Sequence, residues 1–231
     1  MKIYGLQKMT LLDYPGKVAA TVFLGGCNLM CPFCHNYEIA AMSMPPEIND
    51  EEFWEFLAAR KGMLDGIAIT GGEPCINEDL PDFIARIKDM GYLIKLDTNG
   101  FFPDMLEKLL NMGLVDYVAM DIKNSPQKYA LTVGLDDVDM APIMKSISII
   151  MRECPDYEFR TTLIKKYHNI SDIKSIGEMI ARAKKYFLQK FADRLTVPVR
   201  GLSAPDDDTI REFLECAREF VQTAQIRGLE S

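Results

Sequence analysis

The sequence predicts one α/β domain built around a parallel sheet, which is either a doubly wound sheet or an incomplete barrel. Short runs rich in β-branched residues alternate with longer stretches of helical periodicity, as in repeated strand–helix–strand units. The length of 231 residues fits one such domain. Apolar residues make up 48% of the chain, which is enough for a full core. In either architecture the chemistry belongs at the carboxyl ends of the strands.

The first half of the chain supplies three strands, each followed by a helix. The strands are the apolar runs AATVFL at 19–24, GIAIT at 66–70 and YLIKLDT at 92–98. The helices are EEFWEFLAAR at 51–60, DLPDFIARIKDMG at 79–91 and PDMLEKLLNMG at 103–113. Asp50 fits the N-cap of the first helix, Pro81 lies in the first turn of the second, and Gly91 and Gly113 match C-terminal stops.

The second half repeats the alternation three more times. The strands are VDYVAMDI at 115–122, YEFRTTLI at 157–164 and KYFLQKF at 185–191. The helices are at 139–154, at about 173–183 and at 206–221. The last helix begins with DDD, and these carboxylates suit the positive N-terminal end of a helix.

The charge balance limits the classes of partner. The chain has 34 Asp and Glu against 26 Lys and Arg, so its formal charge is −8. An acidic chain has no general attraction for phosphate backbones, so we expect no nucleic-acid partner. No apolar run has the length of a membrane span, and the first residues lack the apolar core of a signal peptide. We therefore expect a cytoplasmic protein with no membrane partner.

Half of the six cysteines lie in the stretch GGCNLMCPFCHN, as Cys27, Cys31 and Cys34. In a reducing compartment, clustered cysteines bind metal more often than they form disulfides. Three thiolates can hold a zinc ion with His35 as the fourth ligand, or an iron–sulfur cube with one iron left open. The scattered cysteines are interpreted as small buried hydrophobic residues: Cys75, Cys154 and Cys216.

Polar motifs lie at the same end of all the other predicted strands. They are TGGEP at 70–74, DTNG at 97–100, DIK at 121–123, RTT at 160–162 and LQKF at 188–191. Each alone fits a turn or a solvated side chain, but their common position is hard to assign to turns. A zinc site with His35 would leave the motifs on strands two to four unexplained. His168, after the fifth strand, is interpreted as a solvated loop histidine.

These motifs resemble those of the radical S-adenosylmethionine (SAM) enzymes. CNLMCPFC matches their C-x3-C-x2-C signature, and GGEP matches their second motif. Together with GLQKMTLLDYPGK, CPFCHN, DTNG, MDIK and EFRTT, they are similar to the longer activating proteins of anaerobic ribonucleoside-triphosphate reductase, which are related to the pyruvate formate-lyase activating enzymes. The resemblance spans nearly the whole chain. It implies a partial (βα)6 TIM-like barrel as a single domain over 1–231, with a core at about 17–200 and a C-terminal helix and tail at 201–231.

The resemblance also implies the cofactors and the partners. One 4Fe–4S cluster per chain is held by Cys27, Cys31 and Cys34, and the amino and carboxylate groups of SAM bind its open iron. Reductive cleavage of SAM yields methionine and a 5′-deoxyadenosyl radical, which removes a hydrogen from the α-carbon of a glycine in a partner protein. The implied partners are a glycyl-radical enzyme, anaerobic ribonucleoside-triphosphate reductase in particular, and a flavodoxin- or ferredoxin-type electron donor.

Two motifs near the cysteines are expected to bind SAM. By resemblance, Phe33 packs near the adenine. Gly71 and Gly72 allow the backbone to approach the methionyl group closely. Glu73 either accepts a hydrogen bond from the SAM ammonium group or caps the helix that follows it.

The remaining expected SAM contacts come from the later strands. Asp97, Thr98 and Asn99 resemble positions that surround SAM in the activases. Lys123 is placed to pair with an anionic group such as the SAM carboxylate. Arg160 lies mid-strand on the same face as Glu158, so it either contacts SAM or forms a core ion pair.

Several departures and alternatives bear on the substrate. The pyruvate formate-lyase activators carry a SAM-binding histidine after the sixth strand, and FADRLTVPVRGLSAPD has none. No cysteine lies between Cys34 and Cys75, so the ferredoxin-like insert of some activators is absent. The alternatives are a radical SAM enzyme acting on another glycyl-radical enzyme, on a peptide or on a small molecule, and a non-catalytic zinc or iron–sulfur module.

Overall fold

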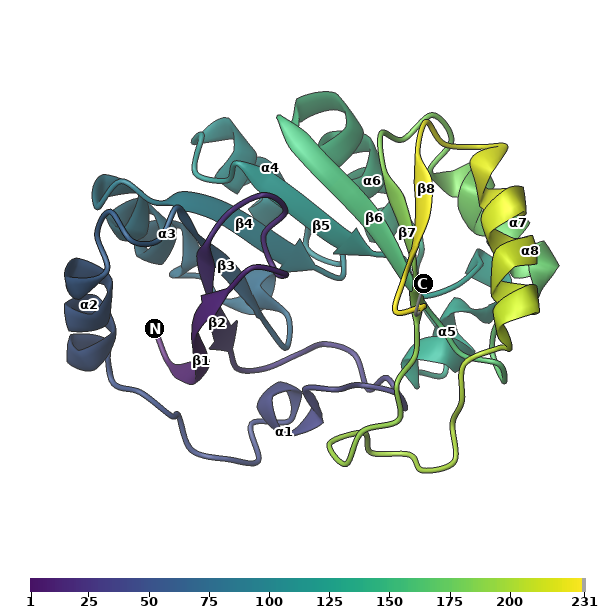
Figure 1. The fold of residues 1–231 in the computed structure, drawn as a ribbon, viewed down its shortest axis with the longest axis horizontal. Helices are drawn as coiled ribbons and strands as arrows, with labels where there is room; N and C mark the ends of the chain where they lie inside the picture. Colours follow the sequence, from purple (N-terminus) through teal and green to yellow (C-terminus); the bar gives the residue numbers. More distant parts are fainter. Residues whose placement is uncertain (230–231) are drawn as a thin grey trace.

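An eight-stranded sheet in sequence order, β1-β2-β3-β4-β5-β6-β7-β8, forms the centre of the chain in a computed structural model that describes residues 1–229 (Figure 1). The first strand pairs antiparallel with the second, and every later pair is parallel. Because β1 and β8 are the two edges of this order, the curved sheet is not closed. The fold is therefore a single α/β domain with an open barrel, which confirms the predicted fold class.

The strands are β1 (Ile3–Thr10), β2 (Ala19–Leu24), β3 (Gly66–Gly71), β4 (Leu93–Thr98), β5 (Tyr117–Asp121), β6 (Asp156–Leu163), β7 (Tyr186–Lys190) and β8 (Ala224–Arg227). The α-helices are α1 (Tyr37–Ala40), α2 (Asp50–Ala59), α3 (Leu80–Asp89), α4 (Pro103–Asn111), α5 (Tyr129–Val133), α6 (Ala141–Glu153), α7 (Ile170–Met179) and α8 (Asp207–Arg218). Two short 3₁₀ helices are η1 (Pro74–Ile76) and η2 (Pro126–Lys128). Within residues 1–229 no helix combines the length and the apolar character needed to span a membrane.

The six predicted strands correspond to β2 through β7, and the two edge strands were not predicted. Gln7, Lys8 and Met9 in β1 are exposed, and β8 has only four residues, so neither strand gives a clear apolar pattern. The N-cap of α2 is Asn49 rather than Asp50, because Asn49 accepts from the Glu52 amide and Glu52 accepts from the Asn49 amide. The helix expected at about 173–183 begins earlier, at Ile170, because Asn169 caps it in the same way.

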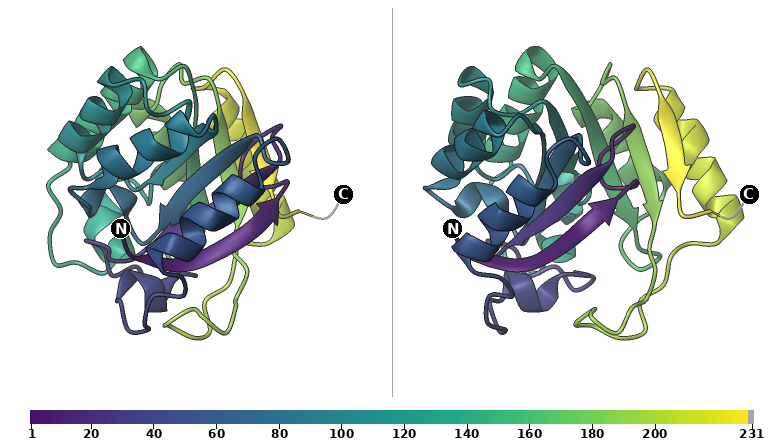
Figure 2. Two further views of the ribbon diagram at one scale, coloured as in Figure 1. Left: turned by 90° about the vertical axis from the view of Figure 1, so that its left-hand side faces the viewer. Right: turned by 60° about the vertical axis from the view of Figure 1, so that its left-hand side comes forward.

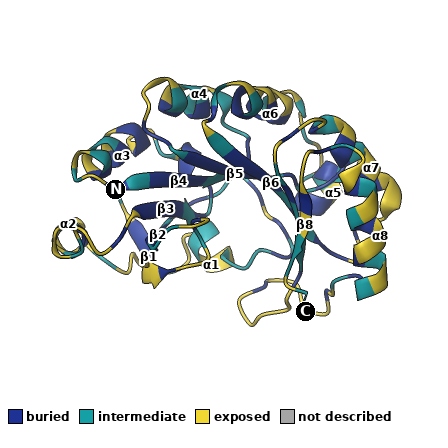
Figure 3. Cartoon of the chain, turned by 45° about the horizontal axis from the view of Figure 1, so that its top comes forward, coloured by how far each residue is buried: buried dark blue, intermediate teal, exposed yellow. Residues whose placement is uncertain are grey.

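Helices α2, α3, α4, α6, α7 and α8 pack on the outer face of the curved sheet, whereas α1 lies below the strands in Figure 1 (Figures 1 and 2). The faces of α2, α3, α4, α6, α7 and α8 that turn toward the strands are buried, and their opposite faces are exposed (Figure 3). The apolar core therefore lies between the strands and these helices. The loops that follow the carboxyl ends of β2 and β7 meet at one edge of the sheet, at the bottom of Figure 1.

Candidate active site

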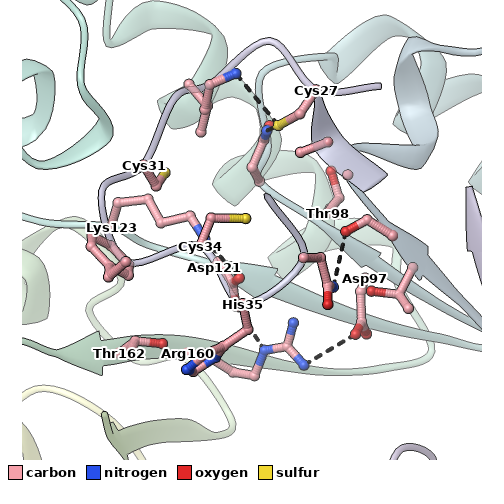
Figure 4. Close-up of a pocket in the computed structure, with 18 of the residues that line it drawn as sticks. Cys27, Cys31, Cys34, His35, Asp97, Thr98, Asp121, Lys123, Arg160 and Thr162 are labelled. Carbon is pink, nitrogen blue, oxygen red and sulfur yellow. Dashed lines mark hydrogen bonds and ion pairs between the residues drawn. The ribbon is translucent and has the colours of Figure 1, made fainter. Parts of the chain in front are cut away.

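A cavity of about 260 Å³ opens at this edge, on the inner side of the sheet (Figure 4). Every strand from β2 to β7 contributes to it, either by its own residues or by the loop that follows it. Of the residues singled out from the sequence, Cys27, Cys31, Phe33, Cys34, Gly71, Gly72, Asp97, Thr98, Asn99, Lys123 and Arg160 line it. Glu73 does not. The sequence therefore located the site, and the roles of these residues stay predictions.

The cysteine loop is held in place by loops from three other parts of the sheet. Asn99 Nδ2 donates to Asn28 Oδ1 at 2.8 Å, which ties it to the end of β4. The Met30 amide donates to the Val133 carbonyl at 3.0 Å, in α5. The Val199 amide donates to the Pro32 carbonyl at 3.2 Å, which joins the long loop after β7. These bonds fix the loop without using the thiols.

The three thiols are poorly solvated. Burial raises the pKa of all three, and it raises the pKa of Cys31 to about 12, although the positive charge of Lys123 acts in the opposite direction. Within residues 1–229 no three His, Cys, Asp or Glu side chains converge as ligands of one metal ion. A four-iron cube does not require the three thiolates to converge on one atom, because each thiolate binds a different iron. The positive charge of the irons would stabilise the thiolate form of these buried side chains. The donor set therefore fits such a cluster.

His35 lies at the border of the cavity but faces the loop after β7. Its ring stacks on Phe191, with centroids 5.5 Å apart and planes at 7°. Its Nε2 lies 2.8 Å from the Ala192 carbonyl oxygen. A ligating histidine commonly bonds a carbonyl through its other ring nitrogen, so this contact leaves the interpretation of His35 as the fourth ligand of a zinc ion open.

Gly71 and Gly72 let the loop after β3 cross directly against the loop after β2. The Gly72 amide donates to the Leu24 carbonyl at 2.9 Å, and the Glu73 amide donates to the Gly26 carbonyl at 2.7 Å. A Cβ on Gly72 would lie only 1.9 Å from the Gly26 oxygen. Gly71 has a φ of +127°, which side chains rarely adopt. Both glycines are thus required by loop packing as well as by the shape of the cavity.

The carboxylate of Glu73 is fully buried and joins two of the motifs. Its Oε1 accepts from the Cys75 amide at 3.0 Å and from Thr98 Oγ1 at 2.8 Å, and its Oε2 accepts from the Asn99 amide at 2.6 Å. Burial raises the pKa of Glu73, while these donors act against the rise. Of the two roles left open by the sequence, capping is the one observed, and a direct contact with the SAM ammonium group stays a prediction.

A chain of alternating charges crosses the inner face of the sheet from β4 to β6. Lys95 pairs with Asp97. Arg160 lies 3.3 Å from Asp97 and 2.8 Å from Asp121, and Lys123 lies 2.8 Å from Asp121. Burial alone would raise the pKa of Asp121, but Arg160 and Lys123 more than offset it and hold the pKa below its usual range. The core ion pair considered for Arg160 is therefore present, while Glu158 pairs with Arg227 instead.

Sequence reasoning missed several residues of the site. Asp121, Thr162 and Gln189 line the cavity, yet the motifs DIK, RTT and LQKF that contain them were noted without assigning these side chains. Asp121 was the residue most open to prediction as part of the site, because it lies two residues before Lys123 at the end of the same predicted strand. His168 is not the solvated histidine we expected: it is 5% exposed, and its Nε2 lies 2.9 Å from the Lys123 carbonyl oxygen.

The other three cysteines fit the interpretation made from the sequence in part. Cys75 and Cys154 are buried and Cys216 is half-buried. None of the three lines the cavity.

Comparison with known proteins defines the class. Residues 21–186 match the radical SAM superfamily, so the chain belongs to it and is a radical SAM enzyme. Within it, the chain is 31% identical over 238 aligned positions to a protein of Methanocaldococcus jannaschii named as a glycyl-radical enzyme activating enzyme, covering 98% of this chain and 96% of that protein. The chain therefore belongs to the family of glycyl-radical enzyme activating enzymes. This membership implies a 4Fe–4S cluster and SAM as cofactors.

Further relatives and solved structures agree with this assignment. The pyruvate formate-lyase-activating enzyme of Listeria monocytogenes is 24% identical over 231 positions, covering 90% of this chain and 92% of that protein. A domain of the pyruvate-formate lyase-activating enzyme of Bacteroides vulgatus aligns with a TM-score of 0.55 at 18% identity, covering 71% of this chain and 99% of the other. Streptococcus suis SuiB bound to its precursor peptide aligns with a TM-score of 0.68 at 13% identity, covering 91% and 48%. At these identities the structures support the fold alone.

Proposed function

We propose that this enzyme activates anaerobic ribonucleoside-triphosphate reductase by generating a glycyl radical on it, in the cytoplasm. The observation that carries the proposal is the cavity itself: three thiols, the Gly71–Gly72 turn and the Asp121–Lys123 pair line one cavity at the carboxyl ends of the strands. Full-length similarity to a protein named as a glycyl-radical enzyme activating enzyme supports the reaction type. The choice of reductase rests on the motifs that resemble its activators.

The residues of the chain divide the work of binding. Cys27, Cys31 and Cys34 would hold the cluster, which when bound supplies the electron that cleaves SAM. The ammonium group of Lys123 faces the cavity, where it is suited to pair with the SAM carboxylate. Asp121 accepts a hydrogen bond from Lys123 Nζ at 2.8 Å and so keeps this group in position. Phe33 lines the cavity with its ring 6.3 Å from that of Tyr167, an apolar surface suited to an adenine.

A neighbouring cavity offers room for a loop of a partner protein. It measures about 490 Å³ and is bordered by Leu12, Asp13 and Pro15 from the loop after β1 and by Arg227 and Gly228 at the opposite edge. It shares Asp97, Arg160 and Gln189 with the first cavity. A glycine loop suits such a site, because glycine has no Cβ to obstruct approach and its α-radical is delocalised over the flanking amides. Ordering that loop costs free energy, so we expect weak and transient binding.

Electron paramagnetic resonance tests the proposal. The chain is reconstituted anaerobically with iron and sulfide, reduced with dithionite and incubated with SAM and the reductase from the same organism. We expect a carbon-centred radical doublet on the reductase, and none on a reductase variant whose target glycine is alanine. A doublet on another glycyl-radical enzyme but not on the reductase would reject the partner. SAM cleavage stimulated by a metabolite or peptide, with no protein radical, would reject activation altogether.

Metal analysis separates this function from that of a non-catalytic zinc module. We expect about four iron and four sulfide per reconstituted chain, because three thiolates with one open iron define a cube. Stoichiometric zinc with no SAM cleavage would favour the zinc module instead. The electron source in the cell is proposed to be a flavodoxin- or ferredoxin-type protein.

A further inference from the structure

Lys95, in the middle of β4, is a buried cation that the expected SAM contacts do not include. Its side chain is 2% exposed, and it borders the second cavity but not the first. Lys95 and Asp97 lie two residues apart on one strand, so both side chains point to the inner face of the sheet. Asp97 borders both cavities, and Lys95 lies further from the carboxyl end of β4. Lys95 therefore belongs to the space that we assigned to the partner loop.

Lys95 is one end of the chain of alternating charges on the inner face, and Lys123 is the other end. The order is Lys95, Asp97, Arg160, Asp121 and Lys123, and the last four are labelled in Figure 4. Three cations thus meet two carboxylates, so the chain of charges carries an excess of positive charge. Lys123 borders the first cavity and not the second, whereas Lys95 borders the second and not the first. One row of charges therefore presents a terminal ammonium group to each of the two cavities.

The ammonium group of Lys95 has hydrogen-bond donors left over. It carries three N–H bonds, and within residues 1–229 its one acceptor is Asp97. Both oxygens of Asp97 are already engaged, one by Lys95 and the other by Arg160 at 3.3 Å. A buried donor without an acceptor is unfavourable. Lys95 is therefore suited to an acceptor that enters the second cavity.

The other carboxylates around the second cavity have donors of their own. Glu158 accepts from Arg227 at both oxygens, at 2.6 and 2.8 Å. Asp13 accepts from the Thr21 hydroxyl at 2.6 Å. Neither carboxylate uses the remaining donors of Lys95. Their negative charge also limits the kind of acceptor that suits the cavity, because an added carboxylate would be repelled by the carboxylates already there.

A main-chain carbonyl oxygen is the acceptor that fits these constraints. It is neutral, it accepts from an ammonium group, and every residue of an entering loop carries one. When such a loop leaves water, its carbonyl groups need new donors, because a buried polar group without a partner costs free energy. Glycine has no side chain that a site could hold, so a loop around a target glycine must be held through its main chain or through the flanking residues. A buried donor at the inner face of the sheet meets this need.

We propose that Lys95 binds the partner loop by donating from Nζ to a main-chain carbonyl oxygen beside the target glycine. This hydrogen bond orders the loop next to the residues that border both cavities: Asp97, Arg160 and Gln189. No covalent bond forms or breaks at Lys95, whose role is to bind the loop and to position it. This inference rests on the proposed function, because it requires a protein loop as the substrate.

Substitution of Lys95 tests the inference with the complete reductase. Lys95→Met removes the donors and the charge, and Lys95→Gln keeps an N–H donor. Lys88→Met is the matched control, because it breaks a half-buried pair with Asp116 at 2.8 Å and borders neither cavity. Initial rates of radical formation are measured by electron paramagnetic resonance against reductase concentration, with dithionite as the reductant. The affinity for SAM is titrated separately.

We expect Lys95→Met to raise the KM for the reductase about ten- to a hundredfold, because it removes a charge-assisted hydrogen bond to the loop. Asp97 keeps Arg160 as its partner, so the Kd for SAM should rise less than about threefold. Lys95→Gln should raise the KM about three- to tenfold, because an uncharged donor remains. Lys88→Met should match wild type in both measurements.

The outcomes separate a role in loop binding from a role in the fold. Thermal unfolding and iron content show whether each variant folds, and Lys95→Gln carries the comparison if Lys95→Met does not. A normal KM for the reductase combined with weaker SAM binding would mean that Lys95 only orders Asp97, and it would overturn the inference. A wild-type dependence of KM on salt that disappears in Lys95→Met would indicate a carboxylate on the loop and would also overturn it.

The wild-type protein separates this inference from the proposed function. Absence of a radical doublet on the reductase with wild-type protein would reject the proposed function itself. A normal doublet with wild-type protein, combined with an unchanged KM in both Lys95 variants, would overturn the role of Lys95 alone.

Discussion

His168 Nε2 lies 2.9 Å from the backbone oxygen of Lys123, which joins the loop after β6 to the end of β5. The Ile164 amide donates to His168 Nδ1 at 3.1 Å, so Nε2 carries the proton and donates to Lys123. Burial lowers the pKa of His168, which keeps the ring in this neutral form. Lys123 is thus held twice, by its backbone through His168 and by its Nζ through Asp121.

We expect His168 to position Lys123 for SAM binding. His168→Phe removes the donor and should raise the SAM dissociation constant about three- to tenfold, which corresponds to the loss of one hydrogen bond. His168→Gln retains an N–H donor and should stay closer to wild type. Equilibrium titration of SAM into anaerobically reconstituted variants measures this. Equal affinities for the Phe variant and wild type would show that the contact serves stability alone.

The assignment of three cysteines as cluster ligands predicts opposite effects of alanine substitution at the cysteines inside and outside the cavity. Alanine at Cys27, Cys31 or Cys34 should abolish cluster binding and SAM cleavage, because two thiolates hold a cube poorly. Alanine at the cysteines outside the cavity should leave the iron content near wild type: Cys75, Cys154 and Cys216. Iron and sulfide analysis after anaerobic reconstitution decides between them. Loss of the cluster on changing a cysteine of the second set would contradict the assignment.

Lys123 and Glu73 should differ in what their loss affects. Lys123→Met removes a cation that faces the cavity, so SAM should bind about ten- to a hundredfold more weakly. Asp121 keeps Arg160 as its partner at 2.8 Å, so the melting temperature should fall less than in the Glu73 variant. Glu73→Gln disturbs a buried acceptor of three hydrogen bonds and should destabilise the fold by about 1–3 kcal/mol. Parallel SAM titration and thermal unfolding separate the two effects. A Glu73→Gln protein of normal stability but poor SAM affinity would restore the direct contact with the ammonium group.

Much of the fold was readable from the sequence because the six central strands are short apolar runs bounded by turn residues. Gly91 and Gly113 have positive φ angles just beyond α3 and α4, as their role as helix stops requires. The edge strands escaped prediction because their stability comes from pairing with β2 and β7 rather than from their own pattern. The predicted end of the last helix also ran too far, since α8 stops at Arg218 and the chain turns into β8.

The site was predicted as a set of motifs, but the contacts between motifs were not. The expected parallel direction of the strands indicated that their ends would meet, because parallel strands present their carboxyl ends on the same side of a sheet. Only the three-dimensional structure shows that Asp121 bridges Lys123 and Arg160, or that Glu73 joins the loops after β3 and β4. Such partners depend on side-chain directions across neighbouring strands, which no one-dimensional spacing specifies.

A buried ion pair attaches the last strand to the sheet and should make stability depend on pH. Arg227 donates from both terminal nitrogens to Glu158, at 2.6 and 2.8 Å, and Tyr117 donates its hydroxyl to the same carboxylate at 2.7 Å. Burial alone would raise the pKa of Glu158, but the hydrogen bonds from Arg227, the charge of Arg160 and the Tyr117 hydroxyl together outweigh it, and the pKa is lowered. Arg227→Met would leave a buried carboxylate with Tyr117 as its hydrogen-bond donor and no paired cation, so we expect a loss of about 2–4 kcal/mol in the free energy of unfolding at neutral pH.

The sign of the pH dependence follows from the lowered pKa. The contribution of the pair is fully present above the ordinary glutamate value of 4.5 and is lost as the pH falls through the lower value of the folded state. Denaturant unfolding curves of wild type and Arg227→Met should therefore converge as the pH drops below 4.5. Arg218→Met, which removes an exposed pair with Glu215 at 2.6 Å, is the control and should change stability by less than about 0.5 kcal/mol. A difference between wild type and Arg227→Met that stayed constant down to acid pH would mean that Arg227 stabilises the sheet by packing on Phe187, 3.5 Å from the ring centroid, rather than by its charge.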